Sequence, residues 1–211
     1  MCPQALYGIA VQVGGVSIQK TVIREADHPN TYEVSLPVGT AGTLSTRTDN
    51  DTGVVTVAAL PAHGITTSDK VDVYWSGGVR YGMSVTAQTS TTISIDLGAG
   101  DNLPIATTAV VITKQVSIGT AIDGDNAKLI AISAEYASPS STAVAHVDMQ
   151  DSGGSSIEEI DLTANSPLVY DIAGGATNVF TGNPIASTKA SNGSATETCT
   201  LKIVSLEDST P

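Results

Sequence analysis

Hydrophobic and polar residues alternate with a period of two along most of this chain, and the helical period of 3.6 residues is nearly absent. The odd-numbered residues from Ala5 to Val13 share one apolar face, and the alternation resumes after Gly14-Gly15. A primed hairpin turn needs positive φ, which glycine adopts freely. The pattern therefore predicts a β-hairpin with its tip at Gly14-Gly15.

The same alternation predicts a series of short strands separated by turns rich in Gly, Asp, Asn and Pro. The segments that we interpret as strands are 32–36, 54–59, 71–75, 79–85, 93–97, 109–112, 128–134, 143–149, 157–162, 168–172 and 197–206, of which 109–112 is a continuous apolar run typical of a central strand. Gly39–Gly42 is predicted to be a loop, and Asp49–Gly53 a turn. In the last strand the apolar register changes between Ile203 and Val204, which indicates a bulge or a strand buried on both faces.

Short strands with frequent turns and no βαβ alternation predict an all-β protein. We expect two tandem small antiparallel β domains, the first barrel-like and the second like a sandwich or jelly roll. The first would span residues 1–114 and include the N-terminal hairpin. Residues 115–127 would be a linker, and residues 128–211 the second domain. A length of 211 residues suits two domains of about 100 residues each.

The charge of the chain is strongly acidic, with 9 Lys and Arg against 21 Asp and Glu, a net charge of −12. Such a surface repels phosphate backbones, so we expect no binding to nucleic acid. Residues 117–211 carry 3 basic and 12 acidic side chains, so most of the excess lies in the second half. Two interpretations stay open: the charge maintains solubility, or this half docks on a basic partner or collects cations.

The N-terminus lacks the basic patch and apolar run of a signal peptide, and no apolar run approaches the ~18–20 residues of a membrane span. We therefore expect synthesis in a reducing cytoplasm and no contact with membrane. Cys2 and Cys199 lie near opposite ends of the chain. They are expected to be free thiols, since a disulfide would require the two ends to meet.

Motifs that carry catalysis are missing from the sequence. There is no Gly-x-Ser-x-Gly elbow and no phosphate-binding loop. His28, His63 and His146 have no metal-ligand spacing, and alternation predicts that His146 faces solvent. Glu158 and Glu159 would point to opposite faces of a strand, so they could not act as an acid–base pair. We expect no catalytic or cofactor-binding residues and no cofactor, although a pair from distant loops is an open alternative.

Two loops place acidic side chains close together, as a calcium ion would require. The candidate ligands are Asp49 and Asp51 in the first loop, and Asp123 and Asp125 in the second. Neither loop has the third donor, the glycine and the distal glutamate of an EF-hand. Each is equally suited to be an ordinary turn, so the metal prediction is none, with these four residues as the calcium hypothesis.

Residues Pro61–Val73, followed by Tyr74-Trp75, contain the run His-Gly-Ile-Thr-Thr-Ser-Asp-Lys-Val. This run resembles the His-Gly-aliphatic-x-x-Gly/Ser-Asp-x-Val element of small β-barrel modules in tailed-phage virion proteins. The resemblance implies that His63-Gly64 turns the chain, Ile65 plugs the barrel and Thr67-Ser68-Asp69 leads into the next strand. It covers about a dozen residues.

The C-terminal half also looks like a virion module, through Asn165–Leu168 and a Gly182-Asn183-Pro184 turn into the last strand. Together the resemblances imply a non-catalytic phage structural protein, synthesised in the bacterial host cytoplasm and located in the virion. It would bind the capsid or tail lattice as a decoration, cement, neck or tail component. Its partners would be other virion proteins and copies of itself, as a trimer or ring. The alternative function is a carbohydrate- or receptor-binding module of a phage fibre or cell surface.

Overall fold

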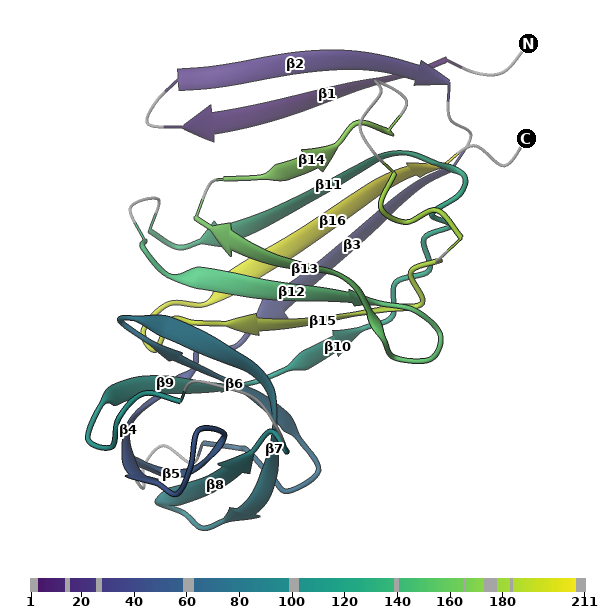
Figure 1. The fold of residues 1–211 in the computed structure, drawn as a ribbon. Coiled ribbons are helices and arrows are strands. Elements are labelled where there is room, and N and C mark those ends of the chain that lie inside the picture. The colour runs from purple at the N-terminus through teal and green to yellow at the C-terminus, as the bar shows by residue number, and fades with distance from the viewer. Residues whose placement is uncertain are drawn as a thin grey trace. The chain divides into compact units, whose positions relative to one another are not determined.

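A computed structural model of the chain describes residues 4–13, 16–25, 28–58, 63–98, 103–138, 141–164, 166–172, 178–182 and 184–207, with side chains from residue 29 onward. The described residues form sixteen strands (Figure 1), which confirms the all-β prediction. Among them, no helix has the length and apolar character to cross a membrane.

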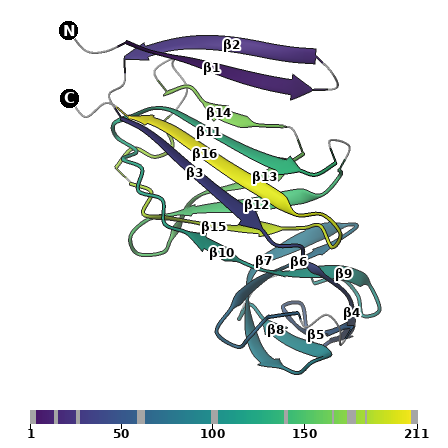
Figure 2. The ribbon, with the colours of Figure 1, turned by 180° about the vertical axis from the view of Figure 1, so that it is seen from behind.

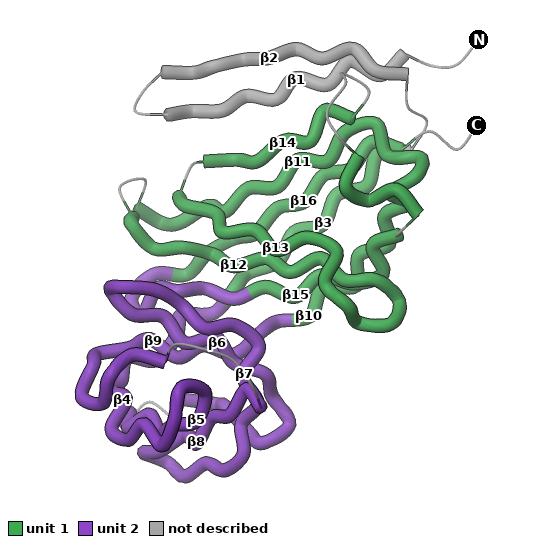
Figure 3. The backbone as a smooth tube through the Cα atoms, viewed as in Figure 1, with its two compact units in different colours: residues 1–36, 117–190, 198–211 green, residues 37–116, 191–197 purple. Residues whose placement is uncertain are grey.

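The chain divides into two compact units (Figure 3). The barrel unit contains residues 37–116 and 191–197, and the sandwich unit contains residues 1–36, 117–190 and 198–211. The boundary at residue 116 falls inside the predicted linker, residues 115–127. That segment is more than a linker, because it contains strand β10 and an antiparallel bridge between Ile122 and Ile185.

The predicted first domain, residues 1–114, has the wrong N-terminal boundary, because residues 1–36 belong to the sandwich unit and not to the barrel unit. Strand β3 (His28–Leu36) pairs with β16 (Cys199–Glu207) over nine residue pairs, so it belongs to the sandwich unit. The barrel unit is thus inserted between two strands of the sandwich unit. A strand's own alternation cannot reveal a partner more than 160 residues away, which is why the sequence pattern missed this connection.

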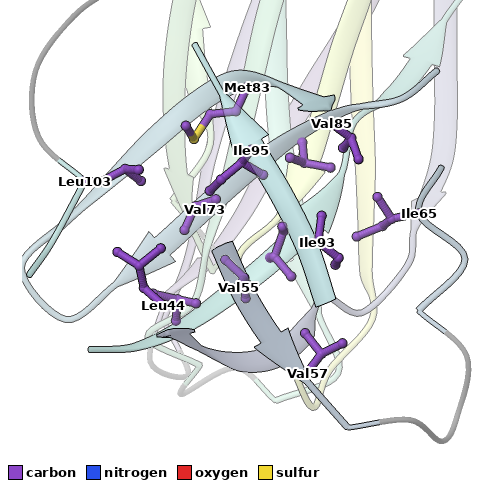
Figure 4. Packing of buried hydrophobic residues seen from close by; sticks show 13 residues of the cluster. Leu44, Val55, Val57, Ile65, Val73, Met83, Val85, Ile93, Ile95 and Leu103 are labelled. Carbon is purple, nitrogen blue, oxygen red and sulfur yellow. The ribbon is translucent and has the colours of Figure 1, made fainter. Parts of the chain in front are cut away.

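The barrel unit is a closed antiparallel barrel of six strands in the order β4-β5-β8-β7-β6-β9, with β9 also paired to β4. These strands are β4 (Thr40–Arg47), β5 (Thr52–Val57), β6 (Lys70–Trp75), β7 (Gly78–Gln88), β8 (Thr92–Asp96) and β9 (Ala109–Lys114). Their inward positions are aliphatic, so closing the sheet fills the lumen with apolar side chains (Figure 4). Closure also removes the unpaired edges of the sheet.

The predicted loop at Gly39–Gly42 is wrong, because Gly42 lies within β4. A Cβ at Gly42 would lie 2.7 Å from the carbonyl oxygen of Thr56 on the neighbouring strand. Glycine is therefore required here by the close approach of two strands, and not by a turn. The predicted strand at 32–36 is part of β3, whereas β4 and β15 (Ser187–Asn192) lie where the alternation predicts no strand.

The sandwich unit has two four-stranded antiparallel sheets, which Figures 1 and 2 show from opposite sides. One sheet has the order β10-β15-β12-β13, with β10 (Val116–Ile118), β12 (Val144–Gln150) and β13 (Ser156–Thr163). The other has the order β14-β11-β16-β3, with β11 (Ala127–Tyr136) and β14 (Leu168–Tyr170). Most strands bury one apolar face, as sandwich packing requires.

Strand β16 is buried on both faces at its C-terminal end, one of the two alternatives predicted. Leu201, Ile203 and Ser205 are fully buried on one face, while Leu206 is buried on the other. The pairing of β16 with β3 shows no register shift. The irregularity lies instead in β11, between Ala127 and Leu129.

The predicted N-terminal hairpin is present as strands β1 (Gln4–Val13) and β2 (Val16–Glu25). They pair in antiparallel register from Gln4–Glu25 to Val13–Val16, which leaves two residues to connect them. The tip itself, Gly14-Gly15, lies outside the described residues.

Candidate functional site

The first calcium candidate is a turn between β4 and β5. The Asp49 carboxylate accepts hydrogen bonds from the backbone N–H groups of Asp51 (3.1 Å) and Thr52 (2.7 Å). A hydrogen bond shared by the two carboxyls lowers the pKa of Asp49 and raises the pKa of Asp51. Asp49 thus performs the ordinary task of an Asx turn, in which a side chain satisfies nearby backbone donors.

The second calcium candidate is also a structural turn, before β11. Asp123 accepts from the Asp125 backbone N–H at 3.1 Å and from the Asn126 side chain at 2.9 Å. Asp125 accepts from the Gly182 N–H at 2.7 Å, and the Gly124 carbonyl accepts from Asn178 at 2.9 Å. The Asp125 carboxylate and the Gly124 carbonyl thus fix the segment 178–182 to this turn of the sandwich unit.

The two acidic turns belong to different units, so the structure does not unite the four predicted residues into one site. In the part of the chain that the structure describes, no group of three or more His, Cys, Asp or Glu side chains is arranged to hold a metal ion.

His146 is buried, and the prediction that it faces solvent is wrong. It is 2% exposed, and its Nδ1 lies 3.0 Å from a carboxylate oxygen of Asp161, its cross-strand partner. The alternation is as predicted, since Ala145, Val147 and Met149 occupy the opposite face of β12. The error lay in assuming that a polar face is open to water. The His28 side chain lies outside the described part.

The polar face of β12 forms a row that the sequence reasoning missed. His146, Asp148 and Gln150 are all buried on it, and the Gln150 amide donates to one carboxylate oxygen of Asp148. The other oxygen of Asp148 is buried without a hydrogen-bond partner among the described residues. Glu159 stands opposite Asp148 on β13. The signal available in the sequence was the succession His-x-Asp-x-Gln.

A second polar cluster that was missed surrounds Asp72 in the barrel unit. Its carboxylate is fully buried and accepts from the Gly82 N–H at 2.7 Å and from the Gln115 amide at 2.8 Å. Its other oxygen accepts from the Ser191 hydroxyl, which also lies 2.6 Å from the Tyr74 hydroxyl. Asp72 therefore anchors the segment 191–197 within the barrel unit, a structural task for a buried carboxylate.

His63 serves the local turn that the sequence predicted. Its Nε2 lies 2.8 Å from the Thr89 carbonyl, and its Nδ1 accepts from the Ile65 N–H at 3.1 Å. Gly64 has a φ of +66°, and Ile65 is buried in the barrel core. Asp69 accepts from Thr66 and pairs with Lys114 at 2.6 Å. Each residue of this element has the local role expected of it.

The remaining reactive groups are placed for packing. Cys199 is a free, fully buried thiol, and burial raises its pKa to about 11, which disfavours the thiolate. Cys2 lies outside the described residues. Glu158 and Glu159 lie on opposite faces of β13, as predicted. Glu158 accepts from the Tyr170 hydroxyl at 2.9 Å, and burial together with this carboxylate raises the pKa of Tyr170.

Comparison with known proteins adds little. No protein-family model and no curated protein matches the chain. One solved structure shows a weak likeness: Bacteroides ovatus SGBP-B of a mixed-linkage glucan utilization locus, in complex with a mixed-linkage heptasaccharide. The identity is 12%, the match covers 92% of this chain and 66% of that chain, and the TM-score is 0.21. A likeness of this size carries no argument.

Proposed function

We propose that the chain is a non-catalytic structural component of a tailed-phage virion, which binds the capsid or tail lattice as a decoration, cement, neck or tail protein. Its partners would be other virion proteins and further copies of itself. The proposal rests on the resemblance of Pro61–Trp75 to virion barrel modules and on the way the fold uses its polar residues.

The observation that carries the proposal is the filled barrel. Thirteen buried apolar side chains pack in the lumen, including Leu44, Met83 and Ile95 (Figure 4). A six-stranded barrel has only enough interior for its own side chains. The barrel is therefore suited to be a rigid module and not a container for a ligand.

The polar groups support the same proposal. Asp72 fastens a chain segment, Asp125 fastens another, and His63 orders a turn. Each of these groups is hydrogen-bonded to other parts of the protein. A catalytic group, in contrast, must have access to substrate. The acidic surface favours lattice proteins over nucleic acid as partners.

Mass spectrometry of purified particles tests this proposal. Particles released by bacteria that encode the chain should contain it at a stoichiometry comparable to other virion proteins. The control is the same preparation from a bacterial strain that lacks the phage genes encoding the chain. If the chain is expressed but absent from the particles, the virion proposal fails. A monomer at every concentration in gel filtration would contradict the trimer or ring.

The carbohydrate-binding alternative is weakened by the aromatic residues. Sugar sites present exposed aromatic faces over polar groups, but no described aromatic side chain is fully exposed. Tyr74 and Tyr81 form an edge-to-face pair with 6.1 Å between ring centroids, and Tyr170 packs against the buried Phe180. Selective binding on a glycan array would restore the alternative.

A further inference from the structure

The sheet β14-β11-β16-β3 carries buried leucines on the face turned away from the sandwich core. Ile130 and Ser205 are fully buried on the core face. Their neighbours Leu129 and Leu206 pair with each other on the opposite face, where they are 3% and 1% exposed. We call this face of β11 and β16 the outer face.

This burial requires a cover. Among the described residues, Leu129 and Leu206 form a cluster of their own, against which only the half-buried Ala131 packs. The next pair on the outer face, Ala131 and Val204, is also apolar, and Val169 lies beside Ala131 on β14. The central residues of a sheet face that is open to water keep part of their surface solvated. An apolar layer must therefore lie over these leucines.

The N-terminal hairpin has a face suited to this task. The register pairs Tyr7 with Val22, Ile9 with Lys20 and Val11 with Ile18, so these positions share one face. The opposite face carries the pairs Gly8–Thr21, Ala10–Gln19 and Gln12–Ser17, and Leu6 with Ile23 is its one large apolar pair. Strands β1 and β2 pair only with each other among the described strands. A two-stranded hairpin needs packing against another layer to be stable.

The connection between the hairpin and the sheet has the right length. Strand β2 ends at Glu25 and β3 begins at His28, so two residues link them. Three steps of 3.8 Å between Cα atoms span at most about 11 Å, and packed sheets lie about 10 Å apart. Strand β3 begins beside the leucines, because Pro29 pairs with Leu206.

We propose that the hairpin packs the face containing Tyr7, Val11 and Ile18 over Leu129 and Leu206 of its own chain, as a third layer of the sandwich unit. This inference is independent of the proposed virion function.

Thiol labelling of a full-length variant tests the inference. Val204→Cys places a thiol on the outer face, and Cys2→Ser removes the N-terminal thiol. Cys199 contributes little background because it is buried and its pKa is about 11. Ser35→Cys, at an exposed position of β3 in the same background, is the accessible reference. Ile18→Asp and Gln19→Asp then place the same charge on adjacent residues that lie on opposite faces of the hairpin.

We expect Val204→Cys to react at least about tenfold more slowly than Ser35→Cys, and Ile18→Asp to remove most of that difference by opening the layer. Gln19→Asp should leave the rate unchanged. Equal rates at positions 204 and 35 would overturn the inference, as would equal acceleration by both hairpin variants. Protection that disappears on dilution, as a dimer dissociates, would also overturn it, because the cover would then come from a second copy.

Discussion

Single glycine or buried polar residues fix the irregular segments of this fold in place. Gly124 illustrates this, because a Cβ there would lie 2.6 Å from the Phe180 Cβ and also meet the Phe180 backbone. The turn Asp123–Asn126 and the segment 178–182 can approach each other only through a residue without a side chain. Asp72 has the corresponding role in the barrel unit, where it accepts from three different segments.

Gly124→Ala should lower the free energy of unfolding by about 1–3 kcal/mol, because the new methyl group has to displace backbone. Gly119→Ala is the matched control, since a Cβ at that position meets nothing within 4 Å. Urea denaturation of both variants measures the effect. Equal stability of the two variants would contradict this prediction, because the segment 178–182 would then move aside for the methyl group at little cost in free energy.

Asp72→Ala should destabilise the barrel unit by about 2–4 kcal/mol, because it leaves the half-buried Gly82 N–H and Gln115 amide without their acceptor. Asp72→Asn should cost less, since its carbonyl oxygen can still accept from both groups. Trp75, the one tryptophan of the chain, lies in the barrel unit and reports its unfolding by fluorescence. An Asn variant as unstable as the Ala variant would contradict this hydrogen-bonding account.

Strands and turns of this protein are joined by side-chain contacts between elements distant in sequence. The turn before β6 is tied to the end of β9 by Asp69 and Lys114, whose charged atoms lie 2.6 Å apart. Burial alone would raise the pKa of Asp69, but hydrogen bonds from Lys114 and Thr66 outweigh it and hold the pKa below the ordinary value of 3.8. The folded state therefore favours the ionised carboxylate.

The stabilisation from Asp69 should be present at neutral pH and disappear in acid. A carboxyl whose pKa is depressed by folding stabilises the fold above its unfolded pKa, and the effect is lost as pH falls through the folded pKa. Asp69→Asn should thus be less stable than the wild type at about pH 6 and nearly equal to it at about pH 2. Denaturation curves at both pH values measure this. A constant difference between the two proteins would contradict it.

The sequence pattern predicted where strands lie better than it predicted what covers or contacts them. Alternation located β6, β8, β12 and β13 within a few residues, because a strand's period is a property of its own sequence. It failed for His146, since alternation separates two faces but does not show whether the second is covered. It also missed β15, whose residues Ser187–Asn192 are mostly polar although four of them are buried. Their burial depends on other segments, as does the Asp72 cluster.

At the scale of the whole molecule, the chain passes between its two units four times, after residues 36, 116, 190 and 197. The segment 191–197 belongs to the barrel unit and includes the last two residues of β15, whereas the rest of β15 and the strand β16 belong to the sandwich unit. Each unit therefore contains segments whose ends continue directly into the other unit, so the unfolding of one unit frees ends that the other had fixed. This connectivity favours a single cooperative transition.

Unfolding monitored in the two units should therefore have one midpoint. Trp75 fluorescence follows the barrel unit, and alkylation of the buried Cys199 follows the sandwich unit. We expect both probes to give the same midpoint in urea for the wild-type chain. Two separated midpoints would show that the segment 191–197 does not couple the units. Ser191→Ala removes the hydroxyl bonded to Asp72. This variant should weaken the attachment of the segment 191–197 and move the two midpoints apart.

The long separation between β3 and β16 has a consequence for synthesis on the ribosome. The barrel strands, residues 40–114, are contiguous and can fold as soon as they emerge. Strand β3 emerges before them, yet its pairing partner β16 begins only at Cys199. Contacts of such high sequence separation form slowly. The nascent chain must therefore carry an unpaired β3 until β16 has emerged, and the charged Glu33 and the Pro29 in β3 are residue types that discourage pairing with other strands in the meantime.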